Sequence, residues 1–217
     1  MKHIAVLVSG GGTNLQALID AQGRGEIVNG SITAVISSSP EAYALERAKQ
    51  AGIPGYVLAR QDYPSNRAMT VALVDKLREL DIQLVVLAGF MTILTEEMVQ
   101  AFPNAILNIH PALIPSFAGP GCYGLHVHEK ALAYGVKLSG ATVHFVSPEC
   151  DGGPIVLQKA VEVLPDDTPE VLQRRVMEQC EWQLLPQAVS LFCQDRLNVE
   201  GRTVRILNAE CRMQNAE

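Results

Sequence analysis

Five short, mostly apolar runs separated by helical segments constrain the fold of this chain more than any other feature. The runs are residues 3–8, 32–36, 55–59, 84–88 and 105–109. The run LVVLA at 84–88 has no polar alternation, which is typical of a strand buried on both faces. Helical spacing of apolar residues is found between the runs, over 15–21, 41–51 and 65–80. Strands that alternate with helices predict an α/β fold with a Rossmann-like, doubly wound, mostly parallel sheet.

The pattern changes after residue 140. Two strands with no helix between them are expected over 141–146 and 154–163. A long helix is expected over 169–195 and a terminal hairpin over 197–207. The pair of strands predicts an antiparallel C-terminal extension of the sheet. The helix is expected to bend near Pro186, and the hairpin to turn at Glu200-Gly201.

Charge and composition exclude several classes of function. The net charge is -6 and no run of four Lys or Arg residues occurs, so no nucleic-acid partner is expected. No apolar run approaches the roughly 20 residues of a membrane span, and the N-terminal run is too short for a signal peptide. The cysteines are odd in number and form no CxxC pair; they are Cys122, Cys150, Cys180, Cys193 and Cys211. We therefore expect neither zinc nor a disulfide framework, and a cytoplasmic location.

The segment VSGGGTNLQAL after the first strand is a candidate phosphate-binding loop. Consecutive glycines let backbone N–H groups turn inward, and the following helix offers its positive N-terminus. Thr13 and Asn14 add side-chain donors. The segment is neither a dinucleotide fingerprint nor a P-loop, so a phosphomonoester fits it better than ATP or NAD. The alternative is a tight turn followed by an ordinary helix start.

The segment LNIHPALIPSF places Asn108 and His110 at the end of a buried strand. Residues two apart on a strand face the same side, so both side chains can converge on one atom. An amide can donate to a developing oxyanion, and an imidazole can donate to the same oxygen or move protons. Pro111 stops the strand directly afterwards. The alternative is a turn asparagine and a histidine at the edge of the core.

An acidic partner for the histidine is expected in the loop SPECDGGPI. Asp151 lies there between two strands and is followed by Gly152 and Gly153. The glycines allow unusual backbone angles at which a carboxylate can be aimed inward. A hairpin loop with a solvent-facing aspartate is the alternative.

Six stretches, in order over nearly the whole chain, carry a family resemblance. They are VLVSGGGTNLQALIDA (6–21), LVVLAGFMTIL (84–94), LNIHPALIPSF (107–117), YGLHVHEKAL (123–132), GATVHFV (140–146) and DGGPIVLQ (151–158). Together they resemble the folate-dependent formyltransferases, in particular the group that acts on glycinamide ribonucleotide. The resemblance implies transfer of a formyl group from 10-formyltetrahydrofolate to the amine of that ribonucleotide, without a metal. The formyltransferase fold is implied as well.

The resemblance also implies roles for individual residues. Asn108, His110 and Asp151 match the catalytic triad. The residues implied in substrate binding are Gly12, Thr13 and Asn14 at the phosphate and Glu181 at the sugar. The residues implied in folate binding are Met91, Thr92, Ile93 and Leu94, with Arg67 near the folate tail. Thr92 stands where some members carry an arginine. The segment SFAGPGCY (116–123) is longer than in the shortest members.

On this basis the chain is expected to be a single domain over 1–217. Its N-terminal half (1–102) would bind phosphate and its C-terminal half (103–207) would carry the triad and the folate, before a loose tail (208–217). A monomer and a homodimer are both compatible with the sequence. The alternative functions are a 10-formyltetrahydrofolate hydrolase and a non-catalytic nucleotide-binding protein. A dinucleotide-dependent oxidoreductase is disfavoured, because Ser37, Ser38 and Ser39 offer no acidic residue for a ribose.

Overall fold

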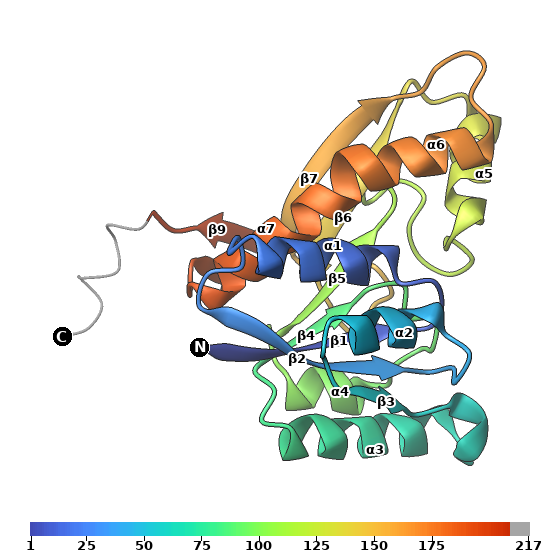
Figure 1. Cartoon of the computed structure of the whole chain (residues 1–217). Helices are drawn as coiled ribbons and strands as arrows, with labels where there is room; N and C mark the ends of the chain where they lie inside the picture. The colour runs from blue at the N-terminus through green and yellow to red at the C-terminus, as the bar shows by residue number, and fades with distance from the viewer. Residues whose placement is uncertain (209–217) are drawn as a thin grey trace.

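The computed structural model describes residues 1–208 and contains a nine-stranded mixed sheet with helices on both faces (Figure 1). The strand order is β3-β2-β1-β4-β5-β6-β7-β9-β8. The strands are β1 (Lys2–Val8), β2 (Gly30–Ser37), β3 (Gly55–Val57), β4 (Leu84–Leu87), β5 (Ile106–His110), β6 (Leu138–Phe145), β7 (Ile155–Glu162), β8 (Leu197–Glu200) and β9 (Thr203–Ile206). The expected loose tail over 208–217 falls, apart from its first residue, outside the described residues.

The helices connect these strands. They are α1 (Thr13–Gly23), α2 (Tyr43–Gln50), α3 (Asn66–Glu79), α4 (Glu96–Ala101), α5 (Leu125–Tyr134), α6 (Pro169–Val176) and α7 (Trp182–Cys193), with a 3-10 turn η1 (Arg60–Asp62) and a π turn η2 (Met177–Glu181). Neither α4 nor α5 was expected from the sequence. α4 has only six residues, which is too short for a periodic pattern to stand out. In the described part of the chain, no helix is long and apolar enough to cross a membrane.

The expected parallel sheet and its antiparallel extension are both confirmed. β1 to β5 pair in parallel, with β1 between β2 and β4. β6 runs antiparallel to β5, and β7 antiparallel to β6. The terminal hairpin is also present, although its turn lies at Gly201 and Arg202, one residue later than expected. Figure 1 shows this hairpin at one end of the sheet, where a single pair, Ile155 with Thr203, connects β9 to β7.

The long C-terminal helix is interrupted at a different place from the expected one. Pro186 lies inside the regular helix α7. The interruption is instead the π turn η2, which precedes Pro186 and separates α6 from α7. This wider turn adds backbone length within the helix and buries both Cys180 and Glu181. Single π turns of this kind often occur at functional sites.

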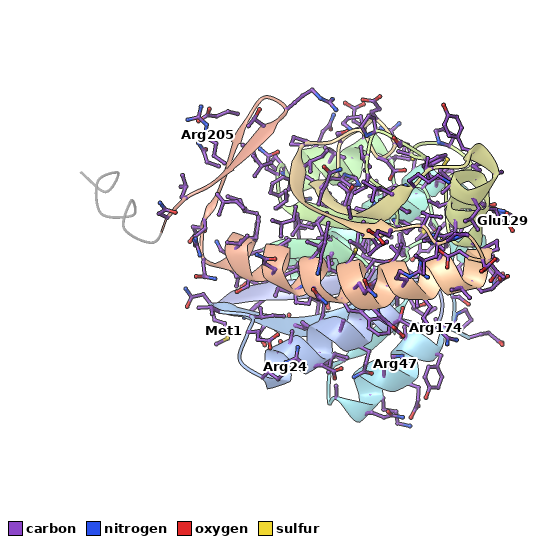
Figure 2. The ribbon with its side chains drawn as sticks, turned by 90° about the horizontal axis from the view of Figure 1, so that it is seen from above. Met1, Arg24, Arg47, Glu129, Arg174 and Arg205 are labelled. Carbon is purple, nitrogen blue, oxygen red and sulfur yellow. The ribbon has the colours of Figure 1, made fainter. Side chains whose placement is uncertain are left out.

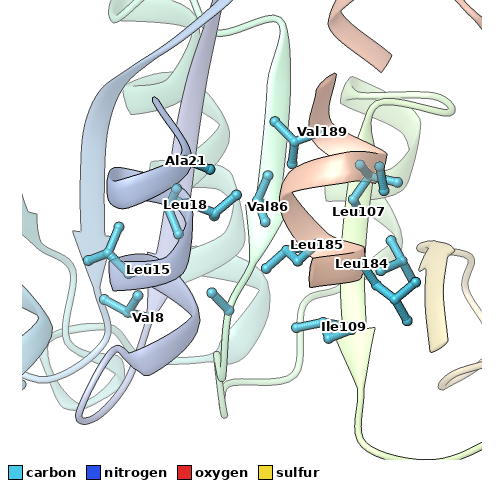
Figure 3. Close-up of a cluster of buried hydrophobic side chains, with 14 of the residues drawn as sticks. Val8, Leu15, Leu18, Ala21, Val86, Leu107, Ile109, Leu184, Leu185 and Val189 are labelled. Atoms are coloured by element: carbon cyan, nitrogen blue, oxygen red, sulfur yellow. The ribbon is translucent and has the colours of Figure 1, made fainter. Parts of the chain in front are cut away.

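The core forms two layers, one on each face of the sheet. On one face, α1 and α7 pack against β4 and β5, where Leu18 and Leu185 lie beside Val86 and Leu107 (Figure 3). On the other face, α3 and α4 cover the parallel strands with residues such as Leu73. Burying one leucine contributes about 1.5–3 kcal/mol, so these layers hold the strand ends firmly in place.

Candidate active site

β5 and β6 present apolar side chains to one face and polar side chains to the other. The apolar residues Leu107, Ile109, Val143 and Phe145 belong to the core shared with α1 and α7. The polar residues are Asn108, His110, Thr142 and His144. Asn108 lies opposite His144, and His110 opposite Thr142. Cross-strand partners have neighbouring side chains on one face of a sheet, so these four residues form a compact polar row.

His144 fixes the orientation of the Asn108 amide. The Nδ1 atom of His144 lies 2.9 Å from the Phe145 carbonyl oxygen, which can only accept, so Nδ1 carries the proton and donates. Nε2 is therefore an acceptor, and Asn108 Nδ2 donates to it over 3.1 Å. Burial lowers the pKa of His144, which favours the neutral ring that this arrangement requires. The second Nδ2 hydrogen of Asn108 remains available to another acceptor.

Asp151 lies between the two histidines of the polar row. Its Oδ2 atom is 3.6 Å from His110 Nδ1, and its Oδ1 atom is 3.7 Å from His144 Nε2. The other ring nitrogen of His110, Nε2, donates to the Phe117 carbonyl oxygen over 2.8 Å. The structure thus brings Asn108, His110 and Asp151 together around one face of β5. Both His110 and Asp151 are largely shielded from solvent.

The glycines after Asp151 act differently from the sequence-based interpretation. The positive backbone angle belongs to Asp151 itself, whose φ is 53°. Gly152 and Gly153 do not have positive φ; at Gly153 a Cβ atom would lie 1.7 Å from the Phe145 carbonyl oxygen. Gly153 is therefore needed for close backbone approach rather than for its angles. Positive φ at a non-glycine residue is uncommon and often accompanies functional sites.

The glycine-rich segment forms a short loop that enters α1. Gly12 is the N-cap of this helix and has a φ of 72°. A Cβ atom added at Gly12 would lie 2.6 Å from the Cβ of Ala44 in α2, so there is no room for a side chain at this position. A Cβ at Gly10 or Gly11 would meet nothing within 4 Å, so the loop faces open space there. No acidic residue lies in the first turn of α1, and no side chain caps it. The helix N-terminus is thus left for an anion.

Asn14 in this first turn makes a buried contact with Glu181 of η2. Asn14 Nδ2 donates to Glu181 Oε2 over 2.6 Å, and both residues are more than nine-tenths buried. Burial raises the pKa of Glu181 to about 7, although the Asn14 hydrogen bond opposes this shift. The Asn14 Oδ1 atom is buried without a partner. Loop and π turn together offer a carboxyl group and a carbonyl oxygen to a ligand with hydroxyl or amine donors.

Arg47 is a candidate that sequence reasoning missed. It projects from α2 beside α1 (Figure 2), where its Nε donates to the Gly11 carbonyl oxygen over 2.8 Å and its Nη1 to Gln16 over 2.9 Å. Together with Thr13 and Gln16, it lines a hollow of about 290 Å³ next to the glycine loop. No motif reveals it, because α2 is brought to the loop by tertiary contacts, the close approach at Gly12 and the hydrogen bond from the Ala44 N–H to the Gly10 carbonyl oxygen.

The segment after β4 lies beside the glycine loop, since the Met91 N–H donates to Ser9 Oγ over 2.8 Å. Met91 and Ile93 are 55% and 76% exposed, which leaves their side chains free to contact a ligand. Thr92 lies between them and is half-buried. Leu94 packs instead against the second core layer.

Arg67 lies away from the polar row. Its side chain is 76% exposed at the start of α3, and its Nε atom forms an ion pair with Glu97 of α4 at 2.5 Å. The position is at the outer surface of the helices that cover the parallel strands. The structure therefore does not bring Arg67 into contact with the polar row or the glycine loop.

His126 and His128 do not form a chelating pair. Two residues apart on α5, they point to different sides of the helix. His126 is exposed and bonds to Glu129 over 2.8 Å, whereas His128 is fully buried. Burial lowers the pKa of His128 to about 4, and its two ring nitrogens have no hydrogen-bond partner.

Comparison with known proteins agrees with this geometry. A family model described as formyl transferase matches residues 2–189. The phosphoribosylglycinamide formyltransferase of Haemophilus influenzae is 46% identical over 200 residues, which cover 92% of this chain and 91% of that protein. The crystal structure of glycinamide ribonucleotide transformylase 1 from Symbiobacterium toebii has a TM-score of 0.90 at 47% identity and covers 96% of this chain and 95% of its own.

A formyltetrahydrofolate deformylase from Pseudomonas syringae is more distant. Its structure has a TM-score of 0.84 at 25% identity, and the match covers 95% of this chain but 66% of that one. The fold, the order of the motifs and the family model, which spans most of the sequence, lead to one assignment. This chain belongs to the formyl transferase family.

Proposed function

We propose that this protein transfers a formyl group from 10-formyltetrahydrofolate to the amine of glycinamide ribonucleotide. The observation that carries the proposal is the convergence of Asn108, His110 and Asp151 on one face of β5. Relatives with 46% and 47% identity are named for this transfer or this substrate, and both are matched over nearly their whole length. The products would be N-formylglycinamide ribonucleotide and tetrahydrofolate.

The reaction needs a stabilised oxyanion and a path for one proton. The substrate amine attacks the formyl carbon, a C–N bond forms, and the carbonyl oxygen becomes negative. The tetrahedral intermediate then breaks its bond to N10 of the folate, and the proton lost by the attacking amine is returned to N10. No net oxidation occurs and no metal is required.

Asn108 and His110 would stabilise the oxyanion. Asn108 has one Nδ2 hydrogen committed to His144, which leaves the other to donate. His110 carries a proton on Nε2 and faces Asp151 with Nδ1. A single donor of this kind is worth roughly 10²–10³ in rate.

The glycine loop and the π turn would hold the ribonucleotide. Gly12, Thr13 and Asn14 present the N-terminus of α1 to the phosphate, and Arg47 adds a positive charge beside it. Glu181 would accept a hydrogen bond from a sugar hydroxyl, and its buried position makes that bond strong.

The folate would lie against the segment after β4. Met91 and Ile93 offer exposed apolar side chains for an aromatic ring system, and Thr92 lies between them. The Ser9 contact keeps this segment next to the phosphate loop, so both substrates would approach β5 from neighbouring loops. We propose no folate contact for Leu94, which packs in the core, and we retain Arg67 only as a contact for the end of the folate tail.

A spectroscopic assay separates this function from its alternatives. Purified protein is mixed with 10-formyltetrahydrofolate, with and without glycinamide ribonucleotide, and the absorbance of the deformylated folate is followed. We expect turnover only when the amine is present. Formate released without the amine would assign the protein to hydrolysis instead, the activity named for the more distant relative. No turnover in either tube would favour a non-catalytic nucleotide-binding protein.

The matched variant for this assay is Asn108→Ala. It removes the proposed oxyanion donor and leaves the glycine loop untouched, so turnover should fall by roughly 10²–10³. Binding of glycinamide ribonucleotide, measured by calorimetry, should change little. Equal turnover by the variant and the parent protein would contradict the role of Asn108.

A further inference from the structure

The chain after β5 is divided into an anchored part and a part held by the catalytic side chains. Residues 112–115 are anchored by β6 and β7. Thr142 Oγ1 donates to the Ala112 carbonyl oxygen over 2.6 Å and accepts from the Ile114 N–H over 3.1 Å. Gln158 donates to the Ile114 carbonyl oxygen over 3.0 Å. These buried contacts end at Pro115.

Residues 116–123, which we call the 116–123 loop, contact the catalytic side chains directly. The Phe117 carbonyl oxygen accepts from His110 Nε2 over 2.8 Å, and the Gly119 N–H donates to Asp151 Oδ2 over 2.9 Å. The loop thus occupies hydrogen-bonding positions of two residues that the proposed reaction needs. It belongs to no helix or strand, so its backbone is not fixed by regular pairing.

Two cysteines flank the contact between Gly119 and Asp151. Cys150 precedes Asp151, and its Sγ lies 3.8 Å from the same Oδ2 atom that accepts from Gly119. Cys122 belongs to the loop and is turned back on Gly119, because its N–H donates to the Gly119 carbonyl oxygen over 3.1 Å. The two cysteines therefore belong to the two chain segments that this hydrogen bond joins.

Lys130 of α5 holds the Cys122 side chain. Its ammonium group lies 3.3 Å from Cys122 Sγ and also donates to the Gly121 carbonyl oxygen over 2.8 Å. Cys122 is half-buried and Cys150 is exposed, whereas Cys180 and Cys193 are buried. Oxidants can therefore reach the pair at the loop but not these two core thiols. Because the Lys130 ammonium lies beside Cys122, whereas the Asp151 carboxylate lies beside Cys150, the first thiol to react would be Cys122.

We propose that Cys122 and Cys150 form a reversible disulfide that locks the 116–123 loop against Asp151 and stops formyl transfer. Formation of the bond is independent of the proposed function, and only its effect on activity rests on that function. A disulfide needs the two Cα atoms within about 4.4–6.8 Å, a separation that the loop, which belongs to no helix or strand, would adopt when the bond forms. In the locked protein, Phe117 would stay on His110 and exclude the substrates.

The oxidant in this proposal is a hydroperoxide. The Cys122 sulfur attacks the peroxide, the O–O bond breaks, and Cys122 becomes a sulfenic acid while water or an alcohol leaves. The Cys150 sulfur then attacks the Cys122 sulfur, the S–O bond breaks, and a second water leaves with the Cys150 proton. Two electrons pass from the thiols to the peroxide, and a dithiol returns them by exchange.

The test uses the reduced full chain treated with hydrogen peroxide. Mass spectrometry of the digested protein should show the peptides of Cys122 and Cys150 joined with loss of two hydrogen atoms. Formyl transfer should fall in proportion to the joined fraction and return after dithiothreitol. The variants Cys122→Ser and Cys150→Ser should show equal activity before and after peroxide, because neither can form the bond.

Separate outcomes decide the two parts of the idea. If no joined peptide forms, the disulfide is wrong. If the joined protein keeps full activity, or if both serine variants are inactivated as the parent is, the lock is wrong. A joined peptide in a protein that shows no transfer even when reduced would support the cysteine pair and count against the proposed function alone. Cys193→Ser serves as the matched control and should behave as the parent.

Discussion

Asn108 depends on His144 for the direction of its amide. Because the Phe145 carbonyl fixes the tautomer of His144, Nε2 can only accept, and the amide nitrogen of Asn108 must point towards it. No short motif contains this pair, since the two residues are 36 positions apart in the sequence. Only the antiparallel register of β5 and β6 places them side by side.

We predict that His144→Ala lowers kcat more than it changes KM for either substrate. The variant keeps Asn108 but releases its amide, and displacing a catalytic group by about 1 Å can cost roughly a hundredfold in rate. Steady-state kinetics with both substrates tests this. A variant with altered KM and normal kcat would show that His144 affects binding rather than the oxyanion.

Glu181 should make stability depend on pH. Its pKa in the folded protein is about 7, above the ordinary value of 4.5, so the folded state binds the proton more tightly. Its contribution to stability is therefore complete below pH 4.5 and is lost as pH rises to about 7. One pKa unit corresponds to about 1.4 kcal/mol, so the shift amounts to roughly 3 kcal/mol.

The isosteric variant Glu181→Gln isolates this effect. The difference in unfolding free energy between parent and variant should change by roughly 2–3 kcal/mol between pH 5 and pH 8, with the parent losing stability. Denaturant unfolding at several pH values measures it. Because other titrating groups are common to both proteins, their effects cancel. Parallel curves for the two proteins would contradict the buried carboxyl assignment.

At the level of single elements, the glycine loop shows which glycines the fold requires. Gly12 has positive φ and touches α2, whereas a Cβ at Gly10 would meet nothing. Gly12→Ala should therefore cost about 1–3 kcal/mol of stability, and Gly10→Ala should stay within about 0.5 kcal/mol. Urea unfolding of the two variants measures this. Equal losses of unfolding free energy in the two variants would contradict the special role of Gly12.

The elements also show how far sequence reasoning reaches. Apolar runs such as 84–88 predicted the strands and their parallel arrangement, because a strand that is buried on both faces is apolar at nearly every position. The exact site of the helix irregularity was missed, since Pro186 gives a clear local signal and the π turn at Met177–Glu181 gives none. Its cause is tertiary: the turn buries Glu181 against Asn14.

The candidate site was predictable to a similar extent. Asn108, His110 and Asp151 were found from strand ends, loop composition and the family resemblance, and the structure places them together. Arg47 and His144 were not found, because each contacts a candidate site residue that is distant in the sequence. Contacts of this kind depend on how helices and strands pack, which one sequence does not reveal.

At the scale of the whole molecule, ligand binding should stabilise the entire fold. The proposed ribonucleotide site joins α1, α2 and η2, which belong to distant parts of the chain. Glycinamide ribonucleotide at about 100 times its Kd should therefore raise the unfolding free energy by about 2.7 kcal/mol. Thermal unfolding with and without this ligand measures the gain.

Arg47→Ala is the control for this measurement. The variant should bind more weakly and show a smaller rise in Tm at the same ligand concentration, while the midpoint without ligand should change less, because Arg47 is only half-buried. An undiminished rise would place the phosphate away from the glycine loop.

The anchoring of residues 112–115 by Thr142 and Gln158 has a consequence for evolution. Because the chain is fixed at Pro115 and resumes a regular helix at Leu125, the stretch between can lengthen or shorten without disturbing β5 or α5. New sequences there would change the contacts that the loop makes with His110 and Asp151, while β5 keeps its position. Lineages could thus acquire or discard control of the enzyme, cysteines included, by altering a single exposed loop.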